Sequence, residues 1–426
     1  MTLLVFFATL FGFIAIGVPI AFALVLCGMA LMVFMGPFES HIIAQRFIDG
    51  LNSYSLLAVP FFVLAGELMS RAGITKRIID FAMVLIGHVR AGLGYVVVMT
   101  SVIFAGLSGS AIADTAAVGT ALVPVMRSYG YNISRVTGLI VSSGIIGPII
   151  PPSVGLIIYG VVTETSIIRL FMAGIIPGLL FGLGLMIVWN ITSRKDTNMV
   201  QTERHSFNDF IKVTKTAFWA LILPIVIIGG LRVGIFTATE AGVVAVFYAL
   251  FVGLVIYREI KLSDLPEIFI ETAKTTGTVL LLVGAGSVTA WYITLSDIPQ
   301  QLTGLLGGLI DSPTLLMLLI VGILFLVGMV MDITPSTLIL APIFLVITNQ
   351  AGIDPIYFGI IFMVTLTIGL ITPPIGVVLF TGMKISGISL VDALKGVWPF
   401  ILVELIIVIL MVLFPQIILV PLKFLI

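Results

Sequence analysis

The chain has 426 residues, of which 60% are hydrophobic and only 9% are charged, and its formal net charge is zero. This composition excludes a soluble globular domain and predicts an all-α polytopic membrane protein surrounded by lipid. The basic residues lie scattered at segment ends, which excludes nucleic acid as a partner. At about 20 residues per crossing, the apolar runs predict roughly ten to twelve membrane segments.

The N-terminal part of the chain predicts scaffold helices, an interfacial helix and a hairpin. Residues 2–35 are longer than one crossing requires and allow one tilted helix or two short ones, because Gly17 and Pro19 interrupt them. Residues 39–50 are amphipathic, which is typical of a helix at the membrane interface. Residues 53–70 are marginal as a span and predict a re-entrant hairpin.

Residues 94–126 predict a broken membrane helix. Two glycines, two serines and an aspartate interrupt an apolar run between Gly106 and Asp114. Non-helical backbone at membrane depth is tolerated only where protein or a water-filled cavity satisfies its polar groups. This interruption therefore predicts part of a binding site for a small solute.

A polar interval at residues 193–216 divides the chain into a first repeat, 1–192, and a second repeat, 217–426. The interval carries five lysines and arginines against three acids, which predicts a cytoplasmic linker by the positive-inside tendency. The second repeat begins with scaffold helices. It then predicts an interfacial segment, a glycine-rich hairpin and a second broken helix, at residues 263–274, 275–294 and 315–348.

Two pairs of motifs indicate that the halves are related. Asp114 and Asp332 lie 218 positions apart, each among hydroxyls in apolar sequence. A G-x-I-x-P-P motif occurs at Gly147 and again at Gly369, 222 positions later. Loop 127–135 carries two arginines whereas its counterpart 349–355 carries none, which favours an inverted repeat. Interrupted segments at matching positions of two halves point to a transporter binding site.

The sequence also limits the source of energy and the chemistry. It contains no G-x-x-x-x-G-K-[ST] phosphate loop and no metal-ligand pattern among its three histidines, so neither nucleotide hydrolysis nor an enzyme activity is expected. No cofactor is expected either. Residues 275–383 contain no lysine or arginine, so an anion there would be held by helix N-termini. Freed carbonyls and hydroxyls suit Na⁺ as a coupling ion.

The interruptions supply the candidate site residues. The substrate-binding candidates are Ser108, Gly109, Ser110, Asp114, Pro151, Pro152, Ser153, Thr334, Pro373 and Pro374. The Na⁺-binding candidates are Ser108, Ser110, Gly147, Gly328, Asp332, Thr334, Gly369 and Thr372. Structural alternatives exist: Asp114 also suits a helix cap, Asp332 a structural hydrogen bond, and the proline pairs simple kinks. Glu67, Glu240 and Glu404 are interpreted as segment-end or packing acids.

Five runs carry a resemblance to a known family. These are Ser53–Glu67 (SYSLLAVPFFVLAGE), Leu107–Ala117 (LSGSAIADTAA), Gly147–Ser153 (GPIIPPS), Thr239–Gly242 (TEAG) and Gly369–Gly376 (GLITPPIG). Together they resemble the large membrane subunit, of the DctM or SiaM type, of a tripartite ATP-independent periplasmic (TRAP) transporter. The resemblance covers essentially the whole chain and looks closest to the sialic-acid and sugar-acid branch.

The resemblance implies an elevator-type, Na⁺-coupled importer of organic acids in the bacterial inner membrane. It further implies two partners, a separate four-helix membrane subunit and a soluble periplasmic substrate-binding protein. Sialic acid or a related sugar acid is the favoured substrate, and C4-dicarboxylate carriers share most of the motifs. An ion channel and a scaffold subunit without a site of its own are the alternatives from other classes.

Overall fold

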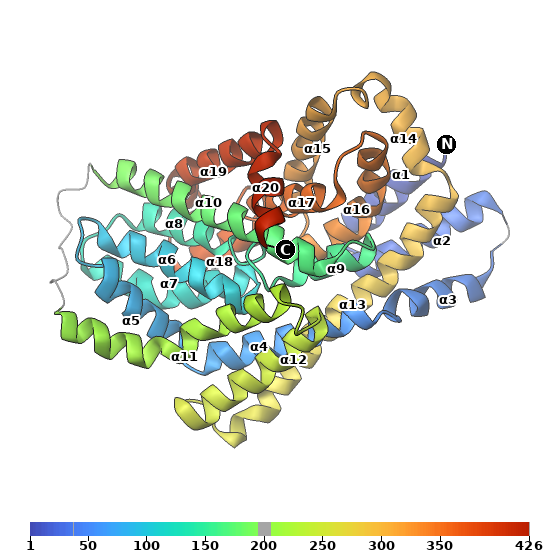
Figure 1. Ribbon diagram of the computed structural model, residues 1–426. Helices are drawn as coiled ribbons and strands as arrows, with labels where there is room; N and C mark the ends of the chain where they lie inside the picture. Colours follow the sequence, from blue (N-terminus) through green and yellow to red (C-terminus); the bar gives the residue numbers. More distant parts are fainter. Residues whose placement is uncertain (37, 195–205, 426) are drawn as a thin grey trace.

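The computed structural model describes residues 1–36, 38–194 and 206–425, and the regular elements of this part of the chain are all helices (Figure 1). Seven of the described helices are long and apolar enough to cross a membrane, and shorter apolar helices accompany them. The prediction of an all-α polytopic membrane protein is confirmed.

The helices follow one another through both halves. The first half contains α1 Thr2–Ala15, α2 Ile20–Met35, α3 Ser40–Leu51, η1 Tyr54–Leu57, α4 Ala58–Arg71, α5 Ile74–Ile86, α6 Gly92–Ser108, α7 Ala111–Ser128, α8 Ile133–Gly144, α9 Val154–Val162 and α10 Ile167–Ser193. The second contains α11 Phe207–Arg232, α12 Ala238–Phe251, η2 Val252–Ile256, η3 Leu262–Asp264, α13 Leu265–Leu295, α14 Ile298–Leu306, η4 Gly307–Leu309, α15 Pro313–Gly328, α16 Ile333–Gln350, α17 Pro355–Gly369, α18 Val377–Ser386, α19 Leu390–Leu413 and α20 Gln416–Leu425.

The structure divides the first predicted segment into two helices and corrects the end of the predicted linker. Residues 2–35 form two helices, α1 and α2, because Gly17 adopts a φ of +85° and Pro19 precedes the first residue of α2. Part of the predicted linker, residues 195–205, lies outside the described residues. Its predicted end at residue 216 is wrong, because a capping box of Ser206 and Asp209 starts α11 at Phe207.

The two predicted hairpins are continuous helices. Residues 53–70 form η1 and α4, and residues 275–294 lie inside the single 31-residue helix α13. Pro60 does not break α4 because it lies in the first turn, where its missing N–H has no helical partner to lose. Two of the α13 glycines make room for neighbours instead of turns: Gly284 faces the ring of Phe47 and Gly286 faces Leu338.

The predicted broken helix at residues 94–126 is a helical hairpin. The indole of Trp189 donates a hydrogen bond to the carbonyl of Ala91, just before α6, at 2.9 Å. The same indole stacks on Tyr131, just after α7, with ring centroids 6.1 Å apart. A straight helix through both segments would separate these points by about 60 Å. We call α6–α7 hairpin 1, and its tip lies at residues 108–110.

The predicted broken helix at residues 315–348 is also a hairpin. The end of α15 meets the end of α17, because Gly328 lies against Gly369, and α15 packs along α17. The helix α16 packs along α17 as well but is joined to its opposite end through residues 351–354. Helices α15 and α16 are therefore antiparallel. We call them hairpin 2, with its tip at residues 329–332.

The broken helices lie just after the hairpins. Helix α8, the irregular residues 145–153 (break 1) and α9 together run alongside α10 in the opposite direction. Along α10, Trp189, Gly178 and Leu170 meet Tyr131, Ile150 and Gly160 in turn. Helix α17, residues 370–376 (break 2) and α18 run alongside α19 in the same way, and Tyr357 at the start of α17 donates to the carbonyl of Met411 at 3.2 Å.

The hairpins enter from opposite ends of the helix assembly. Hairpin 1 opens where the guanidinium of Arg127 donates to the carbonyl of Ser386 at the end of α18. Hairpin 2 opens at the other end, where the phenol of Tyr159 donates to the carbonyl of Pro355 at 3.2 Å. Each half thus contains one hairpin and one broken helix, and the two halves are inverted relative to each other. The open end of hairpin 1 is on the left in Figure 1.

The distribution of charge orients the protein in the membrane. The open end of hairpin 1 gathers Arg90, Arg127, Arg135, Arg194, Lys384 and Lys395. The other end carries Glu164 and Asp354 beside Arg169. Because basic residues accumulate on the cytoplasmic side, the open end of hairpin 1 is cytoplasmic and the open end of hairpin 2 is periplasmic.

A glycine pair fixes hairpin 2 to break 2. A Cβ on Gly369 would lie 2.3 Å from the carbonyl carbon of Gly328, so the two backbones are in direct contact. The amide of Ile375 also donates to the carbonyl of Met329 at 3.2 Å. The sequence analysis proposed both glycines as Na⁺ ligands, and this contact gives them a packing role.

We expect Gly369→Ala to destabilise the protein, because an overpacked contact typically costs about 1–3 kcal/mol and here the neighbour is backbone. The measurement is the thermal unfolding midpoint of the purified protein in detergent. Gly322→Ala on α15 is the matched control, since a Cβ there meets nothing within 4 Å. Equal midpoints for the two variants would contradict the packing role.

Candidate functional site

The two hairpin tips and the two breaks meet around one cavity. This tip cavity has a volume of about 440 Å³. Its wall includes both tips, both breaks and two long helices, α4 and α13. The residues that carry its chemistry are Glu67, Ser70, Ser108, Gly109, Ser110, Pro148, Thr275, Asp332 and Thr334. The predicted meeting of the two interrupted regions is present, and the volume falls in the range of small-molecule sites.

Three helices begin at the tip cavity. Ser110 caps α7 and accepts from the amide of Ala113 at 3.4 Å. Ser153 caps α9 and accepts from the amide of Leu156 at 3.2 Å. Asp332 caps α16 and accepts from the amide of Ile333 at 2.8 Å. Helix N-termini favour anions, and Asp332 already supplies a negative charge at α16. The N-termini of α7 and α9 therefore remain to attract a solute anion.

The tip cavity has no basic side chain in its wall, as far as the described residues show. The absence of lysine and arginine from residues 275–383 thus extends to the described wall of the whole cavity. Glu67 and Asp332 are the acids in the wall. A cation beside these acids would favour the binding of an acidic solute.

Asp114 lies behind the tip of hairpin 1 and not in the cavity. Its side chain is fully buried, and a Cβ on Gly147 would lie 2.3 Å from its Oδ2 atom. Thr115 is equally buried, and its Oγ1 atom would lie 1.9 Å from a Cβ on Gly144. Only glycine permits this close approach of break 1. We call Asp114, Thr115, Gly144 and Gly147 the Asp114 cluster.

The oxygens of this cluster are not held by well-formed hydrogen bonds. In the described part of the chain, neither carboxylate oxygen of Asp114 nor the hydroxyl of Thr115 has a hydrogen-bond partner of good geometry, and the hydroxyl of Ser108 is the side-chain donor beside the carboxylate. A buried carboxylate without a partner is costly, and a bound cation would offset that cost. The cluster thus fits a hard cation such as Na⁺. Capping of α7 is carried out by Ser110, so that alternative for Asp114 is wrong.

The structure corrects the pairing of the two halves. Ser110 and Asp332 both cap the returning helix of a hairpin, and they lie 222 positions apart, as do Pro151 and Pro373. Asp114 therefore corresponds to Ser336 and not to Asp332, one helical turn away. Ser336 is fully buried, and within the described chain its hydroxyl has no hydrogen-bond partner.

The other predicted residues of the two breaks surround the cavity without lining it, whereas Gly109 is part of its wall. Gly109, with φ +64°, rests against the carbonyl of Pro152, which joins tip 1 to break 1. Pro151 and Ser153 lie in the same break. In break 2, Pro373 and Pro374 lie away from the cavity wall, and the buried Thr372 donates to the carbonyl of Ile368 at 2.9 Å.

The sequence analysis missed the contribution of the long helices. Glu67 and Ser70 on α4 and Thr275 on α13 line the tip cavity. Glu67 was interpreted as a segment-end or packing acid, yet it lines the cavity. Its position inside a conspicuous motif, Ser53–Glu67, was the available signal.

A second cavity lies on the cytoplasmic side of the tip cavity. It has a volume of about 600 Å³, shares Ser70 with the wall of the tip cavity and follows α7 from Ala117 to Val125, toward the cytoplasmic end of that helix.

Comparisons with known proteins agree with this architecture. Residues 7–417 match the family model described as the tripartite ATP-independent periplasmic transporter, DctM component. The large permease protein YiaN of the 2,3-diketo-L-gulonate TRAP transporter of Escherichia coli is 49% identical over 99% of both chains. The large permease protein SiaM of the sialic acid TRAP transporter of Vibrio cholerae is 38% identical over 95% of both chains. The crystal structure of the YdaH transporter of Alcanivorax borkumensis shares the fold with a TM-score of 0.64, at 14% identity over 87% of this chain and 86% of that one.

Proposed function

The chain belongs to the family of DctM components, the large membrane subunits of TRAP transporters in the bacterial inner membrane, and from this premise we propose that it imports a sugar acid together with Na⁺. It works with the small membrane subunit and the periplasmic binding protein that define such a system. The observation that carries the proposal is the tip cavity, where two inverted hairpins and two breaks present helix N-termini to one space.

The favoured substrate is a six-carbon sugar acid of the diketogulonate kind. The relative at 49% identity over nearly the full length is named for 2,3-diketo-L-gulonate, whereas the sialic acid relative stands at 38%. Sialic acid, favoured from the sequence, is thus the second candidate, and C4-dicarboxylates are the third. A polyhydroxy acid also suits a wall that combines hydroxyls and carboxylates with helix N-termini.

Na⁺ coupling is supported by the Asp114 cluster. Its oxygens, which are not held by well-formed hydrogen bonds, are hard ligands, and break 1 frees backbone carbonyls that an intact helix would use. The equivalent region of the second half offers Ser336 with break 2, where Gly369 and Thr372 lie. The two cation sites of this proposal therefore lie behind the two tips, and the solute lies between them.

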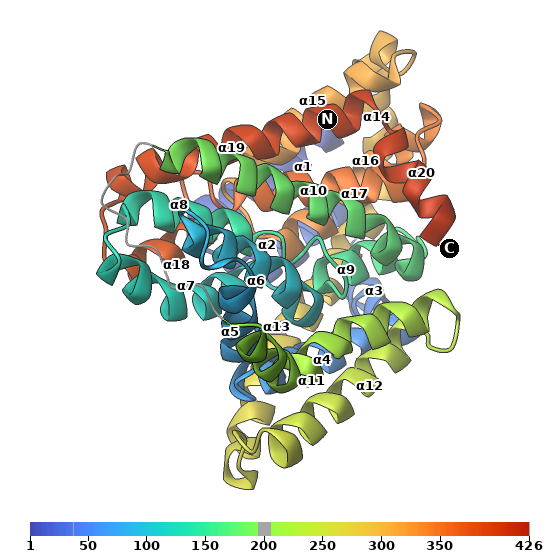
Figure 2. The ribbon, with the colours of Figure 1, turned by 60° about the vertical axis from the view of Figure 1, so that its left-hand side comes forward.

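An elevator movement accounts for access from both sides. The mobile body consists of the hairpins and broken helices, and the scaffold consists of α1, α2, α11 and α12. Helix α4 packs on α12 (Figure 2) and α13 packs on α2, so both stay with the scaffold in this proposal. Residues 263–274 form the end of η3 and the first turns of α13. In this proposal the tip cavity opens to the cytoplasm in one state, and movement of the mobile body toward the periplasm exposes it on the other side.

We expect vesicles containing this chain to import a sugar acid only when the small subunit, the binding protein and an inward Na⁺ gradient are all supplied. The reason is that the described chain has no extramembrane receptor and that the Asp114 cluster requires a cation. The measurement is uptake of radiolabelled sugar acids against their gradient. Concentrative uptake by this chain alone would contradict the need for partners, and non-saturating flux would favour the ion channel.

A further inference from the structure

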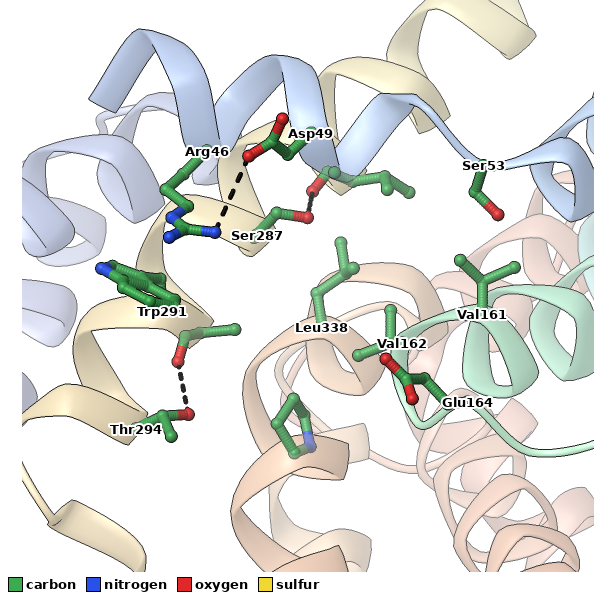
Figure 3. A pocket seen from close by; sticks show the side chains of 15 residues that line it. Arg46, Asp49, Ser53, Val161, Val162, Glu164, Ser287, Trp291, Thr294 and Leu338 are labelled. Atoms are coloured by element: carbon green, nitrogen blue, oxygen red, sulfur yellow. Dashed lines mark hydrogen bonds and ion pairs between the residues drawn. The ribbon is translucent and has the colours of Figure 1, made fainter. Parts of the chain in front are cut away.

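A pocket at the periplasmic end lies on the other side of hairpin 2 from the tip cavity. It has a volume of about 510 Å³ and is formed by α3, α13, α16 and the loop after α9. Figure 3 shows its walls, with Arg46 and Trp291 on one side and Glu164 on the other. We call it the periplasmic pocket.

The guanidinium of Arg46 is held flat and open to the pocket. It lies 3.4 Å from the centroid of the Trp291 ring, so its face is stacked while its N–H edge stays available. Its nearest charged neighbour, the carboxylate of Asp49, is 3.7 Å away, which is longer than a hydrogen bond. No acceptor within the described chain engages its N–H groups by hydrogen bonding. An arginine edge of this kind matches a carboxylate, which binds it through two oxygens.

The opposite wall carries an acid. Glu164 is exposed at the end of the α9 loop and faces the same pocket (Figure 3). Its carboxylate accepts hydrogen bonds from hydroxyl groups and repels a second anion. Ser53 and Ser287 add hydroxyls between the two ends. This arrangement suits a molecule with one carboxylate and several hydroxyls.

A thin wall separates this pocket from the tip cavity. On α13, Val279 lines the tip cavity and Val283 the periplasmic pocket, and on α16 the corresponding residues are Thr334 and Leu338. Four residues span about 6 Å of helix. The wall itself is the contact between α13 and hairpin 2, where a Cβ on Gly286 would lie 2.8 Å from that of Leu338.

We propose that the periplasmic pocket is a capture site for a monoanionic polyhydroxy acid, in which Arg46 binds the carboxylate and Glu164 accepts from the hydroxyls. The pocket selects sugar acids over dicarboxylates, because a second carboxylate would meet Glu164. This proposal rests on the proposed function for the identity of the solute. It adds a basic residue and a specificity-determining acid that the tip cavity lacks.

The test measures protection of a single cysteine. Ser53→Cys on a Cys27→Ala background is labelled with N-ethylmaleimide in the purified complex with the small subunit, without binding protein. D-gluconate should slow the labelling. Arg46→Gln should raise the concentration for half-protection about ten- to a hundred-fold, as expected for loss of a charge-assisted hydrogen bond. Arg169→Gln, the same change in an exposed arginine at the same membrane face, should leave it unchanged.

A second comparison tests the role of Glu164. Succinate should protect Ser53→Cys poorly, and Glu164→Gln should improve protection by succinate more than protection by D-gluconate. Absence of protection by D-gluconate, or equal protection with and without Arg46, would overturn the capture site. Na⁺-driven uptake by the wild-type complex is measured separately, so loss of that uptake would refute the proposed function and not this inference.

Discussion

A disulfide between Gly286→Cys and Leu338→Cys should abolish uptake, and a reducing agent should restore it. The two positions join α13 to hairpin 2, and their Cβ atoms lie within reach of a disulfide after a small shift. If hairpin 2 must slide along α13 to expose the tip cavity to the periplasm, a covalent link there stops the cycle completely. The measurement is uptake by vesicles before and after oxidation on a Cys27→Ala background.

The control links two helices that should not move relative to each other. Gly28→Cys and Val288→Cys join α2 to α13, where a Cβ on Gly28 would lie 3.0 Å from a methyl group of Val288. Oxidation of this pair should leave uptake intact. Full uptake with the first pair oxidised would show that hairpin 2 stays fixed to α13 during transport.

Asp114→Asn should raise the Na⁺ concentration for half-maximal uptake about ten- to a hundred-fold. The change removes a charge from a buried cluster whose oxygens are not held by well-formed hydrogen bonds, and a charge-assisted contact is worth about 1.5–3 kcal/mol. The measurement is the initial rate of uptake against Na⁺ concentration. Asp332→Asn, which alters the cavity wall, should instead change mainly the half-saturating concentration of the solute.

The control for this change is Asp311→Asn, in an exposed loop before α15. It should show the Na⁺ dependence of the wild type. A wild-type titration for Asp114→Asn would place the coupling ion elsewhere, even if the protein transports a sugar acid.

The class of protein and the place of the site could be read from composition and from two interruptions. Glycines, hydroxyls and Asp114 inside an apolar run require a protein-lined space, whatever the path of the chain. That is why Ser108, Ser110, Asp332 and Thr334 meet in the structure. This prediction depends only on which polar groups need hydrogen-bond partners inside the membrane.

The path of the chain could not be read in the same way. A straight broken helix and a hairpin leave the same interruption in the sequence, and only the contact of Ala91 and Tyr131 with Trp189 distinguishes them. The offset of 218 between Asp114 and Asp332 gave the wrong pairing of the two halves, because it matched two residues of the same type that occupy different positions in their hairpins. The capping positions Ser110 and Asp332 match by geometry, at the offset of the proline motifs.

Helix α13 relates the positions of the two cavities to the thickness of the membrane. This uninterrupted helix lines the tip cavity at Thr275 and the periplasmic pocket at Trp291. Sixteen residues of α-helix measure about 24 Å, most of the roughly 30 Å thickness of the hydrocarbon core. The two spaces together therefore extend along most of the hydrocarbon core beside one uninterrupted helix. Shortening α13 by whole turns would therefore shorten the distance over which the solute moves, in addition to weakening its binding.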